Sequence, residues 1–248
     1  MNGVEPKLSV VVPVFNEEDL LESTVESLVV SLQEVEPTFE LILSQNGSTD
    51  HTSELAEQLA QKHVPVRVIH YPRPDYGRAL QNGFIEAQGD FWVNFSIDFI
   101  DLDFLRAALP MLATYDIVLG SKHITPGTDR RPPLRRHGGR AFHWLVQGLF
   151  GLSVRDTHGI KAYRRDRVLG LIARCRQGGA LFDTELILRA HRAGLRLREI
   201  PVRVEETRPS RSGITRRALE SLIGLVHLRF VLWRESGGGF SRKPGFST

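Results

Sequence analysis

The chain has 248 residues, of which 41% are hydrophobic and 25% are charged, and its formal net charge is +3. These values are ordinary for a soluble globular protein. A single cysteine, Cys175, excludes an intramolecular disulfide. No run approaches the ~20 apolar residues of a membrane span.

Charge is distributed unevenly along the chain. Residues 1–115 contain many acids, whereas arginine dominates beyond Lys122, which predicts an anionic partner such as a nucleotide diphosphate, a lipid phosphate or a membrane surface. We expect no nucleic-acid partner, because the chain lacks a zinc finger, a basic zipper and an aromatic-interleaved basic strand. Residues 1–15 lack the basic start and apolar core of a signal peptide, so we expect a cytoplasmic protein.

Strand and helix signals alternate along the first half. Residues 8–15 form a continuous apolar run, which is typical of a buried parallel strand. Residues 16–35 begin with acids and then place apolar residues at helical spacing, which predicts a helix. Similar patterns predict strands at 39–44, 64–71, 90–97 and 115–121, and helices at 48–63, 76–88 and 101–113. This series predicts an α/β fold with a mostly parallel sheet and helices on both faces.

The second half has a different pattern. The predicted elements are a Pro/Arg/Gly-rich loop at 121–140, a helix at 141–151, a turn or short strand at 155–166, a helix at 182–194 and a strand at 195–204. Residues 214–234 predict a basic amphipathic helix, which could lie in a membrane interface or pack on the rest of the chain or on a partner subunit. Residues 235–248 predict a flexible tail.

Polar residues mark the ends of four predicted strands. In open α/β sheets, ligands bind beyond the carboxyl ends of the strands. Those ends contain Asn16-Glu17, Ser44-Gln45-Asn46, Ser96-Ile97-Asp98 and Gly120-Ser121-Lys122, which predicts a polar crevice with at least one carboxylate. The chain lacks the G-x-G-x-x-G, phosphate-loop, zinc-site and G-x-S-x-G motifs. We therefore do not expect a dinucleotide oxidoreductase or a P-loop NTPase.

Several segments in the same order resemble the family 2 glycosyltransferases, and within them the dolichol-phosphate or polyprenyl-phosphate mannosyl/glucosyltransferase branch. They are "LSVVVPVFNEEDLLESTV", "NGSTDHT", "YGRALQNGFIEAQGDF", "VLGSKH", "RDTHGIKAYRRD", "FDTELILRAHRAGLRLREIPV" and "TRPSRSGI". The resemblance covers roughly residues 7–230. It implies a GT-A-type, Rossmann-like fold, an inverting reaction and a divalent metal held by a D-x-D motif. We accordingly divide the chain into one catalytic domain at 1–213, with a nucleotide-binding half at 1–120 and an acceptor half at 121–213, followed by the helix and the tail.

The resemblance also implies which residues bind the nucleotide sugar. Asn16 or Glu17 could instead cap the following helix. Gln45 and Asn46 stand where the family usually has carboxylates, and their amides can still hydrogen-bond a base or ribose without charge. The predicted nucleotide-sugar contacts are Pro13, Asn16, Glu17, Gln45, Asn46, Gly77, Ser96 and Asp98.

The predicted metal site depends on a D-x-D motif that lacks its first acid. Asp98 matches the second acid of D-x-D, whereas the first acid is Ser96. Because magnesium takes one or two carboxylates plus substrate phosphates and waters, Asp98 could still hold Mg²⁺ or Mn²⁺ more weakly. Asp101 could assist, but Asp101 and Asp103 are better explained as residues that cap and stabilise the start of the next helix.

The acceptor decides which further residues are needed. A phosphate acceptor is already ionised and needs cations rather than a base, and the residues that match the basic positions of the lipid-phosphate branch are Lys122, Arg135, Arg136, Arg140 and Lys161. Lys161 replaces a more usual arginine and retains its charge. A hydroxyl acceptor would require a general base, for which Asp156, Asp183 and Glu185 are candidates. We name Asp98 and Glu185 as predicted catalytic residues, and a structural contact between Glu185 and an arginine is an equal alternative.

These observations lead to one main hypothesis and two alternatives. The main hypothesis is an inverting transfer of a hexose from a UDP- or GDP-sugar to a polyprenyl phosphate or related acceptor, by a cytoplasmic or membrane-peripheral enzyme that could form a homo-oligomer. The first alternative is transfer to a hydroxyl acceptor. The second is a non-catalytic nucleotide-sugar binder, because acids are replaced at Gln45, Asn46 and Ser96.

Overall fold

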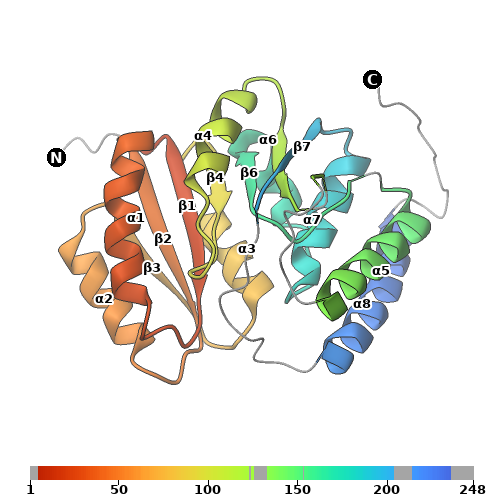
Figure 1. Ribbon diagram of the computed structural model, residues 1–248, viewed down its shortest axis with the longest axis horizontal. Coiled ribbons are helices and arrows are strands. Elements are labelled where there is room, and N and C mark those ends of the chain that lie inside the picture. Colours follow the sequence, from red (N-terminus) through yellow and green to blue (C-terminus); the bar gives the residue numbers. More distant parts are fainter. Residues whose placement is uncertain (1–4, 123, 126–132, 153, 204–213, 236–248) are drawn as a thin grey trace.

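One seven-stranded sheet forms the centre of the molecule (Figure 1). The computed structural model describes residues 5–122, 124–125, 133–152, 154–203 and 214–235, except for the side chains of 133–136 and 214–219. The strands are β1 Leu8–Val14, β2 Phe39–Asn46, β3 Val66–Tyr71, β4 Phe91–Asn94, β5 Ile117–Ser121, β6 Lys161–Arg164 and β7 Leu197–Pro201. Their order is β3-β2-β1-β4-β6-β5-β7, and β6 alone among them runs antiparallel to its neighbours, β4 and β5. The predicted mostly parallel sheet is confirmed.

Helices cover both faces of the sheet, as predicted (Figure 1). One face is covered by α1 Leu21–Val35, α2 Thr52–Lys62 and α4 Leu102–Met111. The other is covered by α3 Tyr76–Glu86, α6 Arg165–Ile172 and α7 Leu181–Arg192. Two long helices, α5 Pro133–Phe150 and α8 Ile214–Glu235, lie side by side next to α7.

Alternation along the strands divides the core into two clusters. In β1, Val10 and Val12 face one cluster and Val11 faces the other. In β4, Val93 faces the same cluster as Val10, and Trp92 faces the same cluster as Val11. Successive side chains of a strand point to opposite faces, so a strand with helices on both sides must be apolar throughout. This explains why β1 is apolar apart from Ser9, whose buried hydroxyl donates a hydrogen bond to Glu40.

The second half departs from the predicted elements in two places. The helix predicted at 141–151 begins at Pro133, within the predicted loop, and proline is favoured at a first helical position. The predicted turn or short strand at 155–166 contains β6 and the start of α6, a short helix that the sequence patterns did not predict. The helix predicted at 214–234 is confirmed as α8. The predicted tail lies outside the described residues, apart from Glu235.

Of the helices that the structure describes, none has both the length and the apolar character needed to cross a membrane.

Candidate active site

The predicted crevice residues meet at one edge of the sheet. Parallel strands β1, β2, β4 and β5 all end there. Antiparallel β6 begins at the same edge, because its first residue, Lys161, pairs with Asn94, the last residue of β4. Residues from the two halves of the chain therefore become neighbours through the reversed direction of one strand.

Hydrogen bonds join the loops that follow β1 and β2. The Thr49 backbone N–H donates to Asn16 Oδ1 at 2.8 Å, and the Asn16 N–H donates to Ser48 Oγ at 3.1 Å. The Glu17 N–H donates to Thr52 Oγ1 at 2.7 Å. Asn16 has a φ of +53°, in the left-handed region that asparagine tolerates better than most residues. Asn16 thus links two loops, and the N-cap of α1 is Leu20 rather than Asn16 or Glu17.

The two amides at the end of β2 are buried. Gln45 and Asn46 are about 5% and 4% exposed. Gln45 Oε1 accepts a hydrogen bond of 3.3 Å from the Gly47 N–H. Asn46 Oδ1 has no hydrogen-bond partner among the described residues. A buried acceptor without a partner is uncommon in proteins, and a donor group on a bound ligand would satisfy it.

A tight turn after β4 presents Asp98 to solvent. The Phe99 N–H donates to the Ser96 carbonyl at 2.9 Å, and the Ser96 N–H donates back at 3.3 Å. Asp98 is exposed between them. Asp101 caps α4 by accepting a hydrogen bond of 2.8 Å from the Phe104 N–H. The capping role predicted for Asp101 is confirmed. Asp98 has no such capping role and remains the candidate metal ligand of this segment.

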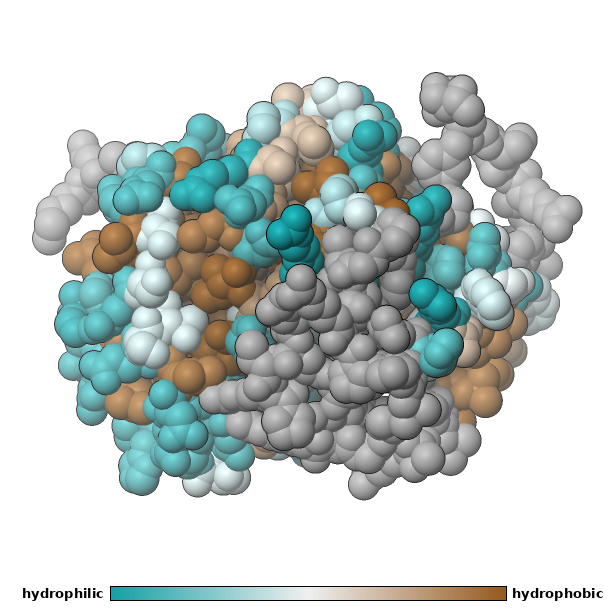
Figure 2. Space-filling view, viewed as in Figure 1, coloured by the Kyte–Doolittle hydropathy of each residue, from teal (hydrophilic) through white to brown (hydrophobic). Residues whose placement is uncertain are grey.

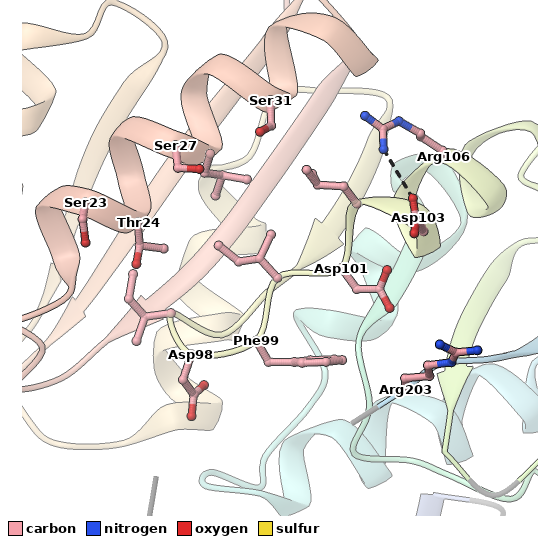
Figure 3. A pocket seen from close by; sticks show the side chains of 14 residues that line it. Ser23, Thr24, Ser27, Ser31, Asp98, Phe99, Asp101, Asp103, Arg106 and Arg203 are labelled. Carbon is pink, nitrogen blue, oxygen red and sulfur yellow. Dashed lines mark hydrogen bonds and ion pairs between the residues drawn. The ribbon is translucent and has the colours of Figure 1, made fainter. Parts of the chain in front are cut away.

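A groove of about 730 Å³ lies beside this turn, between α1 and the start of α4 (Figure 3). Hydroxyl groups of α1 line one wall, and Arg106 and Arg203 line the other end. The carboxylate of Asp98 points away from the α1 hydroxyl groups in Figure 3. Asp98 therefore lies at the border between this groove and the strand-end edge.

A buried network connects the two halves below the edge. Lys161 Nζ donates to Asp183 Oδ1 at 2.7 Å and to the Gly159 carbonyl at 2.6 Å. Both side chains of the ion pair are about 1% exposed. The Lys161 N–H donates to Asn94 Oδ1 at 3.1 Å. This burial differs from the acceptor-phosphate role predicted for Lys161, because the ammonium is enclosed and already has a carboxylate and a carbonyl.

Tyr76, at the start of α3, belongs to this network. Burial, together with the carboxylate of Asp183 to which it hydrogen-bonds, raises the pKa of the Tyr76 phenol well above its usual value. The charge of Asp98 acts in the same direction. The sequence patterns did not single out Tyr76. The one available signal was its position directly after Asp75, which caps α3.

Lys122 and Asp156 form a second ion pair near the end of β5, with 2.6 Å between Nζ and Oδ2. Burial would raise the pKa of Asp156, but Lys122 and His158 outweigh it and lower this pKa to about 2. A carboxylate with such a low pKa is a weak general base. Lys122, predicted to bind the acceptor phosphate, has a carboxylate partner in this structure.

The carboxylate of Glu185 makes contacts that stabilise the fold. It is completely buried, and its Oε2 accepts hydrogen bonds of 2.8 and 2.6 Å from the N–H groups of Arg176 and Gln177. Its Oε1 pairs with Arg189 at 2.7 Å, and Arg189 also pairs with Glu235 of α8. The predicted catalytic role of Glu185 therefore does not fit the structure, because both oxygens hold the α6–α7 loop and α7 in place.

The remaining predicted site residues lie in different parts of the structure. Gly77 is buried where α3 meets the start of α7, and a Cβ there would lie 2.6 Å from the Gly179 carbonyl oxygen, so its role in the structure is close packing. Pro13 is half-buried in β1. Arg140 is exposed on α5. The side chains of Arg135 and Arg136 lie outside the described part of the chain.

The residues present allow only a sparse metal site. Within the described ranges, no three His, Cys, Asp or Glu side chains gather in a way that could hold a metal ion. One exposed carboxylate at Asp98 nevertheless suits Mg²⁺ or Mn²⁺, since these ions bind through one or two carboxylates when substrate phosphates supply further oxygens.

The order of the strands and the polar edge define a GT-A-type α/β domain. The chain superposes with a TM-score of 0.63 on glucosyl-3-phosphoglycerate synthase from Mycobacterium tuberculosis, solved with Mn²⁺, UDP-glucose and phosphoglyceric acid. The match covers 88% of this chain and 79% of that chain at 22% identity, so it supports the assignment of the fold alone.

The chain belongs to glycosyl transferase family 2, whose model matches residues 9–187. It is 34% identical over 207 residues to glycosyltransferase AglD of Haloferax volcanii, covering 81% of this chain and 33% of that protein. It is 28% identical over 242 residues to a dolichyl-phosphate beta-glucosyltransferase of Trichomonas vaginalis, covering 90% of this chain and 72% of that protein. The chain thus spans about a third of the length of the first relative. The resemblance inferred from the sequence is confirmed.

Proposed function

We propose that this chain is an inverting glycosyltransferase that transfers a hexose from a UDP- or GDP-sugar to a polyprenyl phosphate, at the cytoplasmic face of a membrane. The observation that carries the proposal is the meeting of Asn16, Asn46 and the Asp98 turn at one sheet edge. The names of the relatives support the donor and acceptor classes, since one is a dolichyl-phosphate beta-glucosyltransferase and a structural neighbour was solved with UDP-glucose.

The state of the candidate bases favours a phosphate acceptor. A hydroxyl acceptor must lose its proton to a base during the reaction. In this structure Glu185 has four hydrogen-bonded or ionic contacts, Asp183 is paired with Lys161, and Asp156 is paired with Lys122. A phosphate oxygen needs no such base, because it is already ionised at neutral pH.

The proposed reaction is a single displacement. An oxygen of the acceptor phosphate forms a bond to the anomeric carbon, and the bond from that carbon to the nucleoside diphosphate breaks with both electrons on the leaving oxygen. The buried amides of Gln45 and Asn46 would orient the base or ribose, and Asp98 would hold Mg²⁺ or Mn²⁺. A bound metal ion would neutralise charge on the leaving diphosphate.

The acceptor phosphate also needs positive charge from the chain. Because Lys122 and Lys161 are paired with carboxylates, we assign this role first to the arginines of α5. Arg140 is exposed there, and Arg135 and Arg136 lie on the same helix within its first turn. Arginine suits the role because its planar guanidinium binds phosphate through two hydrogen bonds.

A panel of nucleotide sugars, each with and without Mg²⁺ or Mn²⁺, tests the donor. A ligand that binds the folded state raises the melting temperature, and the stabilisation grows with the logarithm of the ratio of ligand concentration to Kd. We expect one UDP- or GDP-sugar to raise it, and the same donor to support transfer to a short-chain polyprenyl phosphate.

The residue test compares two exposed carboxylates a few residues apart. Asp98→Asn should abolish most turnover without lowering the melting temperature. Asp103→Asn, which removes a solvent-exposed carboxylate paired with Arg106, should leave turnover unchanged. Donor binding without turnover for any acceptor would instead support the non-catalytic alternative, and equal turnover of both variants would remove Asp98 from the site.

A further inference from the structure

One histidine at the strand-end edge has no role in the reaction proposed above. His158 lies in the turn at 156–159, directly before β6, and it is exposed. The Phe142 ring of α5 meets the His158 ring edge-on, with 4.9 Å between the ring centres. Among the described residues, the ring has one hydrogen-bonding neighbour, Thr157, whose Oγ1 lies 3.3 Å from Nδ1. The other ring nitrogen, Nε2, can therefore reach a ligand.

The turn that carries His158 is held in place by its neighbours. Lys122 Nζ and the His158 backbone N–H bind the two oxygens of Asp156, at 2.6 and 3.1 Å. A Cβ at Gly159 would lie 2.1 Å from the Gly120 carbonyl oxygen, so the turn packs directly against the end of β5. A ring on such a turn is oriented before a ligand arrives, which lowers the entropic cost of binding.

The charges around the ring form opposite pairs. Asp156 pairs with Lys122 at 2.6 Å, and Asp183 of α7 pairs with Lys161 of β6 at 2.7 Å. On the side of α5, the residues that flank Phe142 in the sequence include Arg140 and His143. Because each of the two lysines already faces a carboxylate, the pairs offer little net positive charge to an incoming anion.

Without a ligand, the His158 ring is neutral at pH 7. The residue is accessible from the edge, but protein surrounds its other sides, and this enclosure lowers the pKa of the imidazole below its ordinary 6.5. The carboxylates of Asp183 and Asp156 act against this effect, whereas the ammonium groups of Lys161 and Lys122 add to it. A phosphate at Nε2 would add negative charge and would favour the protonated ring.

We propose that Nε2 of His158 binds the acceptor phosphate, and that the ring takes up one proton as the phosphate binds. When the phosphate arrives as a dianion, this proton comes from solvent, and it stays on Nε2 as a donor to a phosphate oxygen. The arrangement supplies a positive charge that is absent from the free site. The inference rests on the proposed function, because it assigns a contact to the acceptor of that reaction.

The surroundings of the ring suit an acceptor phosphate. Arg140 is exposed on α5, the helix that contacts His158, and Figure 2 shows hydrophilic residues on the part of the surface where α5 lies. Transfer of the hexose converts a dianionic phosphate monoester into a diester with one negative charge. The contact with a protonated ring should therefore weaken when the product forms, which favours product release.

Nuclear magnetic resonance of the full chain with ¹³C-labelled histidine measures the pKa of His158. The variant His158→Gln identifies its signal among the nine histidines. We expect a pKa below 6.5 in the free chain and a rise of about one pH unit when a short-chain polyprenyl phosphate saturates the site. A polyprenyl sulfate of the same chain length carries a single negative charge and should raise this pKa less.

The KM for the same acceptor gives a second measurement. In wild type the KM should increase as the pH rises from 6.5 to about 7.5, because the free ring is neutral over this range while the bound ring is protonated. His158→Gln cannot take up the proton, so it should raise the KM roughly tenfold at pH 6.5 and remove this pH dependence. Its kcat should change much less, since the contact is already present in the bound ground state.

His70→Gln is the matched control. His70 is an exposed histidine of β3 that is paired with Glu57, and its replacement should leave the KM and its pH dependence unchanged. Both variants should keep the wild-type melting temperature, because both residues are exposed.

Two results would overturn the proposal: an unchanged pKa of His158 at saturating acceptor, or a wild-type KM for His158→Gln across this pH range. If hexose transfer is still observed, either result leaves the proposed function intact. A raised pKa with polyprenyl phosphate, without transfer from any nucleotide sugar, would refute the proposed function and support the phosphate contact.

Discussion

Replacement of Lys161 by methionine distinguishes a structural lysine from one that binds the acceptor. The Lys161 ammonium and the Asp183 carboxylate are 2.7 Å apart and about 1% exposed. Removing one partner of a buried ion pair leaves an uncompensated charge and costs about 3–5 kcal/mol. For a chain of this size, each kcal/mol lowers the melting temperature by roughly 2–4 °C, so we expect a decrease of about 6–20 °C.

Urea unfolding and thermal melts followed by circular dichroism measure this loss. The double variant Lys161→Met/Asp183→Leu should recover most of it, because replacing both partners of a buried pair by apolar residues is often nearly neutral. Lys62→Met is the control, since Lys62 is an exposed lysine paired with Glu26 and should leave stability unchanged. The reasoning is refuted if Lys161→Met keeps wild-type stability and raises the KM for the acceptor alone.

Three further predictions concern the site. Asp156 has a pKa of about 2, against an ordinary value of 3.8, so its ion pair with Lys122 should stabilise the fold by roughly 2 kcal/mol above pH 3.8. This contribution should be lost as the pH falls toward 2. Denaturant titrations at several pH values should show that Lys122→Met removes this part of the acid transition. Gly77→Ala should cost about 1–3 kcal/mol in unfolding experiments, because its methyl group would meet backbone of the loop before α7, and an unchanged free energy would contradict the close packing. Ser96→Asp should increase the affinity of Mn²⁺ in the presence of UDP about tenfold, measured by calorimetry, because it adds a carboxylate two residues before Asp98; no increase would mean that position 96 does not face the metal.

Periodicity in the sequence was sufficient to predict the first half of the fold. The strand at Leu8–Val14 and the helices around it follow from local patterns, because apolar spacing directly reflects which faces are buried. The strand-end rule for open sheets also predicted where Asn16, Asn46 and Asp98 would lie. These inferences needed no knowledge of distant contacts.

The acceptor half could not be predicted in the same way. The antiparallel direction of β6 depends on pairing between residues far apart in the chain, such as Asn94 and Lys161. A charged residue in a sequence reads as exposed until its partner is known, and the partner of Lys161 is 22 residues away at Asp183. Glu185 looked like a candidate base for the same reason. A structural contact to an arginine was the equal alternative, but the choice of Arg189 and the two backbone donors become visible only in the folded structure.

The contacts of Arg189 have a mechanical consequence. Its guanidinium holds Glu235 at the end of α8 and Glu185 in α7, and Glu185 holds the backbone of the loop that leads into α7. The first turn of α7 contains Asp183, which lies beneath the strand-end edge. A force applied to α8 would therefore reach the floor of the site through a short series of bonded groups, and these contacts couple the end of α8 to the place where chemistry is proposed.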